Sequence, residues 1–477
     1  MNALLAALAL ALAAGVALTI PGGAAAVILC AVCAFVAGAM LARGEGAQRP
    51  FIVKVFVAGL LVRMVVGSLI NSFQLQEFFG GDAMIYDLFG NVLAQAWRSG
   101  LPQPAEVGDW AVAGGWGMLY LVAAIYAVVG RNMLAVQFFN AVLGAATAPV
   151  IFFCARQIFQ NVRVAKLAGL SVAFYPSLVL WSSQGLKDGP IVFLLALAML
   201  ATLRLGERMS MKYVFMLGVS MFAILTLRFY VFYMLAAAVG GAFVVGMRQI
   251  SSQSMARQLV VIGALGVGFT YFGVLRTASM QYERFGNLQA VQTSRADLAR
   301  SANSGFGGDV DVSTASGAIS VIPLGMAYLL FAPFPWQLAS LRQMITLPEM
   351  VVWWAAFPLL IVGIWFTLSY RLRQALPILL FTMMLTLAYS IFQGNVGTAY
   401  RQRSQILVFY FIFVAVGAVL LKERQEDKRR KAEAEKRQAV AGLTRAAEAR
   451  RRYTVWNQER EKELERIAQD INERVNF

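Results

Sequence analysis

Long apolar blocks with few charged residues recur along this chain, and they decide what it can fold into. Each runs for about 17 residues or more, within the range of roughly 17–25 residues that a helix uses to cross a bilayer. Backbone N–H and C=O groups cannot stay unpaired in lipid, so such blocks must be helical. We see no alternation over about ten residues of the kind that a membrane β-barrel requires. The sequence therefore predicts an all-α polytopic transmembrane helical bundle.

Composition excludes several classes of function. Only 14% of the residues are charged and 59% are hydrophobic, whereas soluble domains carry about 25% charged residues. The net charge of +16 would suggest nucleic acid in a soluble protein. No basic surface domain remains once the apolar blocks are removed, so we expect no nucleic-acid binding. The sequence contains no histidine, which excludes histidine-based triads and histidine metal ligands.

Lys and Arg residues favour cytoplasmic loops, and they set the topology of the apolar blocks. This rule predicts about 12 spans with both termini inside. The uncharged N-terminus is interpreted as the first span. Arg63 would lie within a span, so we expect it to face protein or a wet cavity. The predicted spans are 3–20, 24–42, 51–70, 133–153, 167–182, 190–205, 213–227, 229–247, 258–275, 349–368, 375–391 and 405–421.

Two further apolar segments leave the count open by two. The number of crossings between the basic loops must keep each of them in the cytoplasm, and this requires that 116–129 lies along the membrane. It also requires that 319–336, which three prolines interrupt, is re-entrant or lies on the surface. The chain then divides into an N-terminal hairpin (1–50), a membrane module (51–421) and a charged helical tail (422–477).

The tail is predicted to be one long, solvated, cytoplasmic helix, because charges of both signs alternate along it. It carries a weak apolar stripe at helical spacing. Two readings stay open: a helix that binds a protein partner or a second copy, and a solvated helix near anionic lipid. The stripe consists of Leu464, Ile467, Ile471 and Val475.

Polar residues gather on the side of the membrane opposite to the basic loops. The first group is Gly80-Gly81-Asp82, just beyond the third span. Asp82 is a candidate site residue, and it is also in the usual position to cap a helix over 83–97. Both readings can hold together. Asp87 is five residues later and would point another way on that helix, so it is not a candidate.

Cations at the outer ends of spans are unexpected under the positive-inside bias. A phosphate ligand at the outer surface would explain them, since guanidinium groups bind phosphate oxygens bidentately. Contact with lipid headgroups, or pairing with Asp or Glu, would explain them as well. The outer groups are Lys187 with Asp188, Arg228 with Tyr230, and Arg401 with Arg403.

The order of these segments resembles the GT-C superfamily of glycosyltransferases, which includes protein O-mannosyltransferases and the lipid A aminoarabinose transferase. The likeness covers roughly 75–275 and, less tightly, 319–421. The strings that carry it are GGDAMIYDLFGNVLAQAW, MLYLVAAIYAVVGRNMLAVQFFNAVLGAATAPVIFFCARQIF and FYPSLVLWSSQGLKDGPIVFLLALAML. FAPFPW and GTAYRQR resemble late segments of related bacterial polysaccharide-cluster proteins. This chain lacks the His-Pro-Pro-like segment of many relatives.

The resemblance implies a donor sugar linked to polyprenyl phosphate and an active site that begins at Asp82 and Tyr86. Asp82 would act as general base on an acceptor hydroxyl, with inversion at the anomeric carbon. Lys187, Arg228, Arg401 and Arg403 would bind the lipid phosphate, and Tyr230 accompanies Arg228. Asp188 would orient the acceptor or hold Mg²⁺ or Mn²⁺, so cofactor use stays open.

The implied function is sugar transfer to a glycan, lipid or protein acceptor during cell-envelope or exopolysaccharide assembly. The protein would be a multi-pass protein of the bacterial inner membrane, with its active site facing the periplasm or exterior. One rival reading is an O-antigen or exopolysaccharide polymerase or ligase, which would use arginines of the outer loop 276–318. Others are a transporter and a non-catalytic assembly scaffold. A transporter would show acids and broken helices near mid-membrane, often in two related halves.

Overall fold

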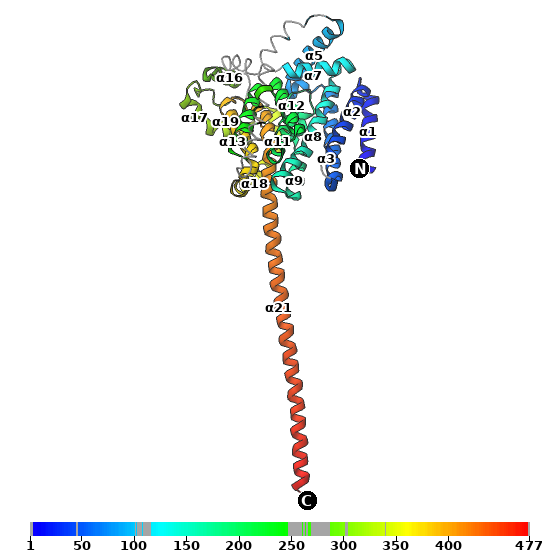
Figure 1. Ribbon diagram of the computed structural model, residues 1–477, viewed down its shortest axis with the longest axis vertical. Coiled ribbons are helices and arrows are strands. Elements are labelled where there is room, and N and C mark those ends of the chain that lie inside the picture. The colour runs from blue at the N-terminus through cyan, green and yellow to red at the C-terminus, as the bar shows by residue number, and fades with distance from the viewer. Residues whose placement is uncertain are drawn as a thin grey trace. The chain divides into compact units, whose positions relative to one another are not determined.

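The computed structural model consists of helices joined by turns and short irregular segments within the residues that it describes (Figure 1). These are residues 3–43, 46–100, 116–246, 287–300, 304–338 and 340–475, with isolated positions 102, 107, 260, 263 and 266–268. Within these ranges there is no strand, and an isolated bridge pairs Gly305 with Asn395. The chain forms two compact units, Met1–Gly417 and Ala418–Phe477.

Within the described part of the chain, seven helices are long and apolar enough to cross a membrane. They are α2 (Gly23–Leu41), α3 (Arg49–Ser72, preceded by the 3-10 turn η1, Gly46–Gln48), α8 (Met133–Phe159), α11 (Asp188–Glu207), α18 (Leu341–Tyr370), α19 (Leu372–Phe392) and the start of α21 (Ser404–Val475). An eighth span is formed if α9 (Val162–Phe174) and α10 (Pro176–Ser182) count as one, bent by 55°. The prediction of a polytopic helical membrane protein is therefore confirmed.

Five shorter apolar helices accompany these: α1 (Ala3–Thr19), α7 (Trp116–Val129), α12 (Met211–Leu227), α13 (Phe229–Val245) and α17 (Ala315–Phe331). With a rise of about 1.5 Å per residue, the 14 residues of α7 extend about 21 Å. This described part of α7 is shorter than the apolar thickness of about 30 Å. Length does not separate α17 from α1, α12 or α13, because each has 17 residues.

Eleven of the twelve predicted spans coincide with a described helix or with the bent pair. The remaining one, 258–275, lies outside the described residues apart from isolated positions. The predicted polar outer loop 276–318 contains a helix instead, α16 (Leu288–Arg300). Short elements complete the first unit: α4 (Gln76–Gly80), α5 (Asp82–Ser99), α20 (Val396–Gln402) and the 3-10 turn η2 (Pro335–Gln337).

The centre of the first unit is α8, which packs against α2, α3, α9 and α11. Asn132 caps α8 by accepting from the backbone N–H of Ala135 at 3.1 Å. Gly144 of α8 lets Arg63 and Ser182 lie close to this helix, because a Cβ at Gly144 would lie 2.4 Å from Ser182 Oγ and 2.9 Å from Arg63 Nε. α8 thereby holds α3, which carries Arg63, next to the end of α10, which carries Ser182 and precedes Asp188 in the chain.

Buried arginines close the ends of helices in this bundle. Arg63, which is 1% exposed, donates to Ala173 O at 2.8 Å and to Ser182 Oγ at 2.8 Å. Its guanidinium thus satisfies a carbonyl that the break between α9 and α10 leaves open. This confirms the prediction that Arg63 faces protein. Arg295 similarly donates to Ile391 O and Gln393 O at the end of α19.

Helices α5 and α7 pack on each other and lie at one end of the first unit (Figure 1). Asp87 joins them: its carboxylate accepts from Tyr126 OH and forms an ion pair with Arg131. The expectation that Asp87 points away from Asp82 is confirmed, because its oxygens are used in this clamp. The clamp fixes α5, whose first residue is Asp82.

The second unit consists of the continuation of α21, which runs as one helix to Val475. This confirms the prediction that the charged tail is helical. Three residues of its apolar stripe, Leu464, Ile467 and Ile471, are each at least half accessible.

Candidate active site

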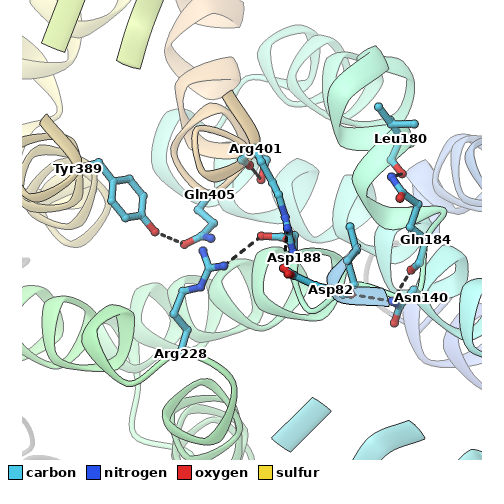
Figure 2. A network of polar contacts seen from close by, with 11 residues as sticks. Asp82, Asn140, Leu180, Gln184, Asp188, Arg228, Tyr389, Arg401 and Gln405 are labelled. Atoms are coloured by element: carbon cyan, nitrogen blue, oxygen red, sulfur yellow. Dashed lines mark hydrogen bonds and ion pairs between the residues drawn. The ribbon is translucent and has the colours of Figure 1, made fainter. Parts of the chain in front are cut away.

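Four segments far apart in the sequence meet at one cluster of charges. They are the start of α5, the start of α11, the junction of α12 and α13, and α20. Figure 2 shows Arg401 between Asp82 and Asp188, with Arg228 pointing to Asp188 from another side. The sequence argument placed all four segments on the same face of the membrane, and these contacts agree with it.

Arg401 bridges the two carboxylates. Its Nη1 donates to Asp82 Oδ2 at 2.8 Å and its Nε donates to Asp188 Oδ2 at 2.6 Å. Burial disfavours the charged form of Arg401, but attraction to Asp188 and then to Asp82 outweighs burial and raises its pKa. The arginine is therefore a fixed positive charge at the centre of the cluster.

The short helix α20 holds Arg401 in this position. Asn395 caps α20 by accepting from the backbone N–H of Gly397 at 2.7 Å. Tyr400, next to Arg401, donates its hydroxyl to the buried Glu349 of α18 at 2.8 Å. The guanidinium of Arg401 also lies 6.0 Å from the ring of Trp181, at the limit of cation–π contact. These contacts anchor α20 at its start and next to Arg401.

Asp82 is the accessible carboxylate of the pair, with 48% of its side chain exposed. It begins α5, but its side chain makes no capping hydrogen bond. The helix-cap interpretation is therefore not what the structure has, and the carboxylate faces Arg401 instead. A Cβ at Gly80 would lie 3.2 Å from Leu186 Cδ1, which is a tight contact, and 3.9 Å from Arg401 Nη1, which is an ordinary one. Gly81 has open space around it.

Asp188 differs from Asp82 in that both of its oxygens are engaged and it is fully buried. Oδ2 accepts from Arg401, and Oδ1 lies 3.5 Å from Arg228 Nη2. Asn140 of α8 fixes the preceding loop by donating to Gln184 O at 2.7 Å and to Leu186 O at 2.8 Å. Such a carboxylate can hold two guanidinium groups in place, but it has no free oxygen to accept a proton.

Two guanidinium N–H groups in the cluster have no hydrogen-bond partner among the described residues: Arg228 Nη1 and Arg401 Nη2. Both atoms are buried, and buried donors are normally paired. Arg228 is 6% exposed, and the ring of Tyr230 lies 5.8 Å from its guanidinium. The two unpaired donors are what a bound anion would satisfy.

A cavity of about 250 Å³ opens beside these groups, and we call it the polar cavity. Lys187 contributes a third cation to its wall. Burial, and then repulsion from Arg228, lowers the pKa of Lys187 to about 8. The lining residues are Asp82, Lys187, Leu227, Arg228, Phe229, Tyr230, Arg401 and Gln402.

Tyr86 lies behind this wall and is 3% exposed. Burial, followed by the negative charge of Asp82, raises the pKa of its phenol. Tyr86 is therefore a neutral neighbour of the cluster and is not part of the cavity lining.

A second cavity, of about 510 Å³, lies on the other side of Arg401, and we call it the apolar cavity. Arg401 lines both cavities, and Arg342 at the start of α18 is the other charged residue in the wall of the apolar one. Its volume is typical of ligand sites, roughly 300–1,000 Å³. Much of its surface comes from apolar side chains such as Phe79, Leu180, Trp181 and Ile345.

Arg403 is the one predicted site residue that the structure does not bring to the cluster. It is fully buried and donates to Leu330 O at 3.0 Å and to Ala332 O at 3.2 Å, at the end of α17. Its side chain closes a helix end, as those of Arg63 and Arg295 do. Tyr400 separates it from the cavities, with the Arg403 guanidinium 4.9 Å from the Tyr400 ring.

Sequence reasoning missed Arg342, Trp181 and Asn140. Arg342 carried a usable signal, because it precedes the span 349–368 on the predicted outer side, like the other unexpected outer arginines. Asn140 also carried one, as an amide in the middle of an apolar block. Trp181 carried no signal beyond its place near Asp188.

No group of three or more His, Cys, Asp or Glu side chains gathers as a metal site within the part of the chain that the structure describes. The sequence left open that Asp188 holds Mg²⁺ or Mn²⁺, and the carboxylate clustered with it is that of Asp82.

Comparison with known proteins gives one family match. The family model of dolichyl-phosphate-mannose-protein mannosyltransferases matches residues 115–271, about a third of the chain. The match includes Lys187, Asp188, Arg228 and Tyr230. A search of curated proteins gave no match.

Solved structures of an archaeal oligosaccharyltransferase from Archaeoglobus fulgidus also match. AglB in complex with an inhibitory peptide and a dolichol-phosphate has a TM-score of 0.44 and 10% identity, and the enzyme in its apo form has 0.39 and 12%. Each alignment covers 80% of this chain and 52% of the other, so this chain spans about half the length of those proteins. At these scores the likeness carries no further conclusion. The family match agrees with the resemblance found in the sequence.

Proposed function

We propose that this protein transfers a sugar from a polyprenyl-phosphate-linked donor to an acceptor hydroxyl at the extracytoplasmic face of a bacterial inner membrane. The observation that carries the proposal is the bridging of Asp82 and Asp188 by Arg401, beside two unpaired guanidinium donors. A carboxylate that is open to solvent and a buried set of cations are what displacement of a lipid phosphate needs.

The two cavities suggest where each part of the donor lies. The isoprenoid chain occupies the apolar cavity, and its phosphate lies at Arg401, which lines both cavities. The sugar then extends into the polar cavity, toward Asp82. Arg228 and Lys187 supply further positive charge at the phosphate.

Donor binding frees the base in this scheme. Before binding, Arg401 Nη1 donates to Asp82 Oδ2 at 2.8 Å and occupies that oxygen. A phosphate at Arg401 competes for that donor and releases Asp82 toward the acceptor. Asp188 keeps Arg401 and Arg228 in place throughout, so it acts as a positioning residue.

The reaction is a single displacement. The acceptor oxygen bonds to the anomeric carbon while its proton passes to the Asp82 carboxylate. The bond between that carbon and the phosphate oxygen breaks, and the electron pair stays on the phosphate, where Arg401 stabilises it. Attack from the face opposite to the leaving group inverts the anomeric configuration.

The polymerase or ligase reading depends on four arginines of the outer loop 276–318, of which the structure describes Arg295 and Arg300. Arg276 and Arg284 lie outside the described residues. Arg295 is buried and spends its donors on backbone carbonyls at the end of α19. The cluster around Arg401 therefore favours the transferase that depends on Asp82.

Turnover by an Asp82→Asn variant tests the proposal. Protein reconstituted in proteoliposomes would be given labelled polyprenyl-phosphate-mannose, the donor class named by the matched family, with a membrane extract as the source of acceptor. We expect the variant to lose about 100-fold to 10,000-fold in rate, the usual contribution of a general base. Glu77→Gln, an exposed acid in α4, is the matched control and should transfer normally. Full transfer by Asp82→Asn would refute the assignment.

A further inference from the structure

The bridge between Asp82 and Asp188 has the arrangement of a divalent-cation site, but a side chain fills it. Two carboxylates from separate helices face each other, and in many enzymes such a pair holds Mg²⁺ or Mn²⁺. Here the guanidinium of Arg401 lies between them, at 2.8 Å from Asp82 Oδ2 and 2.6 Å from Asp188 Oδ2. A cation shared by these two oxygens would have to occupy the same space.

The remaining oxygens do not offer an alternative position. Asp188 is fully buried, and its second oxygen faces Arg228 Nη2. Asp82 alone retains a free oxygen, and Mg²⁺ or Ca²⁺ sites draw on about six or more oxygen ligands, several of which come from water or substrate. Within the described residues no third His, Cys, Asp or Glu joins the pair.

Charge balance disfavours a metal ion as well. The polar cavity has three cationic side chains in its wall, Lys187, Arg228 and Arg401, against the carboxylates of Asp82 and Asp188. A divalent cation added to this set would be repelled by three nearby positive charges, whereas an anion would be attracted. The unpaired donors on Arg228 and Arg401 are also groups that an anion satisfies and a cation cannot.

We infer that Arg401 takes the place of a divalent cation, so that this protein binds the phosphate of its lipid substrate without a metal ion. The inference rests on the proposed function only in the identity of the anion. Arg401 supplies the positive charge that a metal would supply elsewhere, and its covalent attachment to α20 makes that charge permanent. The carboxylates then serve to orient a guanidinium, with Asp82 also available as base.

Two binding measurements on the full chain in detergent test this inference. In the first, Mn²⁺ is titrated and free Mn²⁺ is followed by electron paramagnetic resonance, with and without farnesyl phosphate. In the second, farnesyl phosphate binding is measured by calorimetry, before and after removal of divalent cations with a chelator. The second measurement is repeated on Arg401→Ala and on Arg208→Ala, an exposed arginine near the other end of α11.

We expect no stoichiometric Mn²⁺ binding in either state, and a farnesyl phosphate affinity that the chelator leaves unchanged. Arg401→Ala should lower the affinity for farnesyl phosphate by about 10-fold or more, because charge-assisted hydrogen bonds are lost. Arg208→Ala should leave that affinity unchanged. Arg401→Lys keeps the charge and is the second variant to measure if Arg401→Ala folds poorly. We expect it to keep part of the farnesyl phosphate affinity.

One equivalent of Mn²⁺ bound by the wild type and lost in Asp82→Asn would overturn the inference, as would a 10-fold loss of farnesyl phosphate affinity on chelation. Neither measurement depends on turnover. If farnesyl phosphate binds without metal but no sugar is transferred, the proposed function fails and the present inference stands.

Discussion

The Asp188→Asn variant tests whether Asp188 holds the two arginines in place, whereas Asp82→Asn tests the general base. The side chain of Asp188 is fully buried, and it accepts from Arg401 Nε at 2.6 Å and contacts Arg228 Nη2 at 3.5 Å. Asn has nearly the same shape but no charge. Its amide can accept at one oxygen only, and its NH₂ group would point donors at one of the two guanidinium groups.

The size of the effect follows from burial. Removing one partner of a buried ion pair costs about 3–5 kcal/mol, because the remaining charge is left without compensation. Arg401 keeps Asp82 as a second partner and the Arg228 contact is long, so we expect about 3 kcal/mol, at the lower end. Asp82 is half exposed, and the same substitution there should cost less than about 1 kcal/mol.

Equilibrium unfolding of both variants in mixed detergent micelles measures this difference, with helical circular dichroism as the signal. We expect Asp188→Asn to unfold at a lower denaturant concentration than the wild type. Asp82→Asn should unfold close to the wild type although it is inactive. Equal stability of the two variants would refute the reasoning, because it would mean that Asp188 does not hold the two arginines.

Three further predictions concern residues around the cluster. Because the pKa of Lys187 is lowered to about 8, its positive charge is present below pH 8 and is lost above it. Farnesyl phosphate affinity should therefore fall from pH 7 to pH 9, and calorimetry on Lys187→Arg should show a flatter profile; identical profiles would exclude Lys187 from binding. Arg403→Met should lower the free energy of unfolding by about 1–3 kcal/mol, because it leaves buried carbonyls unpaired, and the KM for the donor should stay unchanged. A 10-fold rise in that KM would show that Arg403 belongs to the binding site. Glu349→Leu should lower the unfolding midpoint by leaving the Tyr400 hydroxyl unpaired, and Glu349→Gln should restore most of it; equal midpoints would contradict the anchoring of α20.

Much of the site was predictable because membrane topology limits which residues can meet. Asp82, Asp188, Arg228 and Arg401 come from segments between 40 and 319 residues apart, but each follows or precedes a span on the same side. Only that side offers water and room for charges. Sidedness alone therefore brought them to one surface, and the contacts of Arg401 agree with the prediction.

The role of Arg403 was not predictable by this argument. An outer arginine at the end of a span can bind a phosphate, or it can satisfy the carbonyls that a helix leaves open at its end. Arg403 does the second, for carbonyls of Leu330 and Ala332. Choosing between the two requires knowing where α17 ends relative to α20, which is a matter of packing between distant helices.

The helix α16 and the two cavities escaped prediction for a similar reason. The segment 288–300 has mixed polarity. Asn287 marks its start by accepting from the backbone N–H of Ala290 at 2.6 Å, a cap signal that the sequence reasoning did not use. Arg295 becomes buried only through contact with the end of α19. The apolar cavity is the space between α18, α20 and the α10 turn. Its existence depends on how these elements pack, and a sequence pattern does not specify that.

A structure of the full chain with a non-transferable polyprenyl-phosphate-sugar analogue tests the central claim most directly. The account predicts that the phosphate lies within about 3 Å of Arg401 nitrogens, at hydrogen-bond distance, with the sugar between Arg401 and Asp82 and the lipid in the apolar cavity. It also predicts no metal density between the phosphate and Asp188. A phosphate bound away from Arg401, or a sugar out of reach of Asp82, would contradict the account.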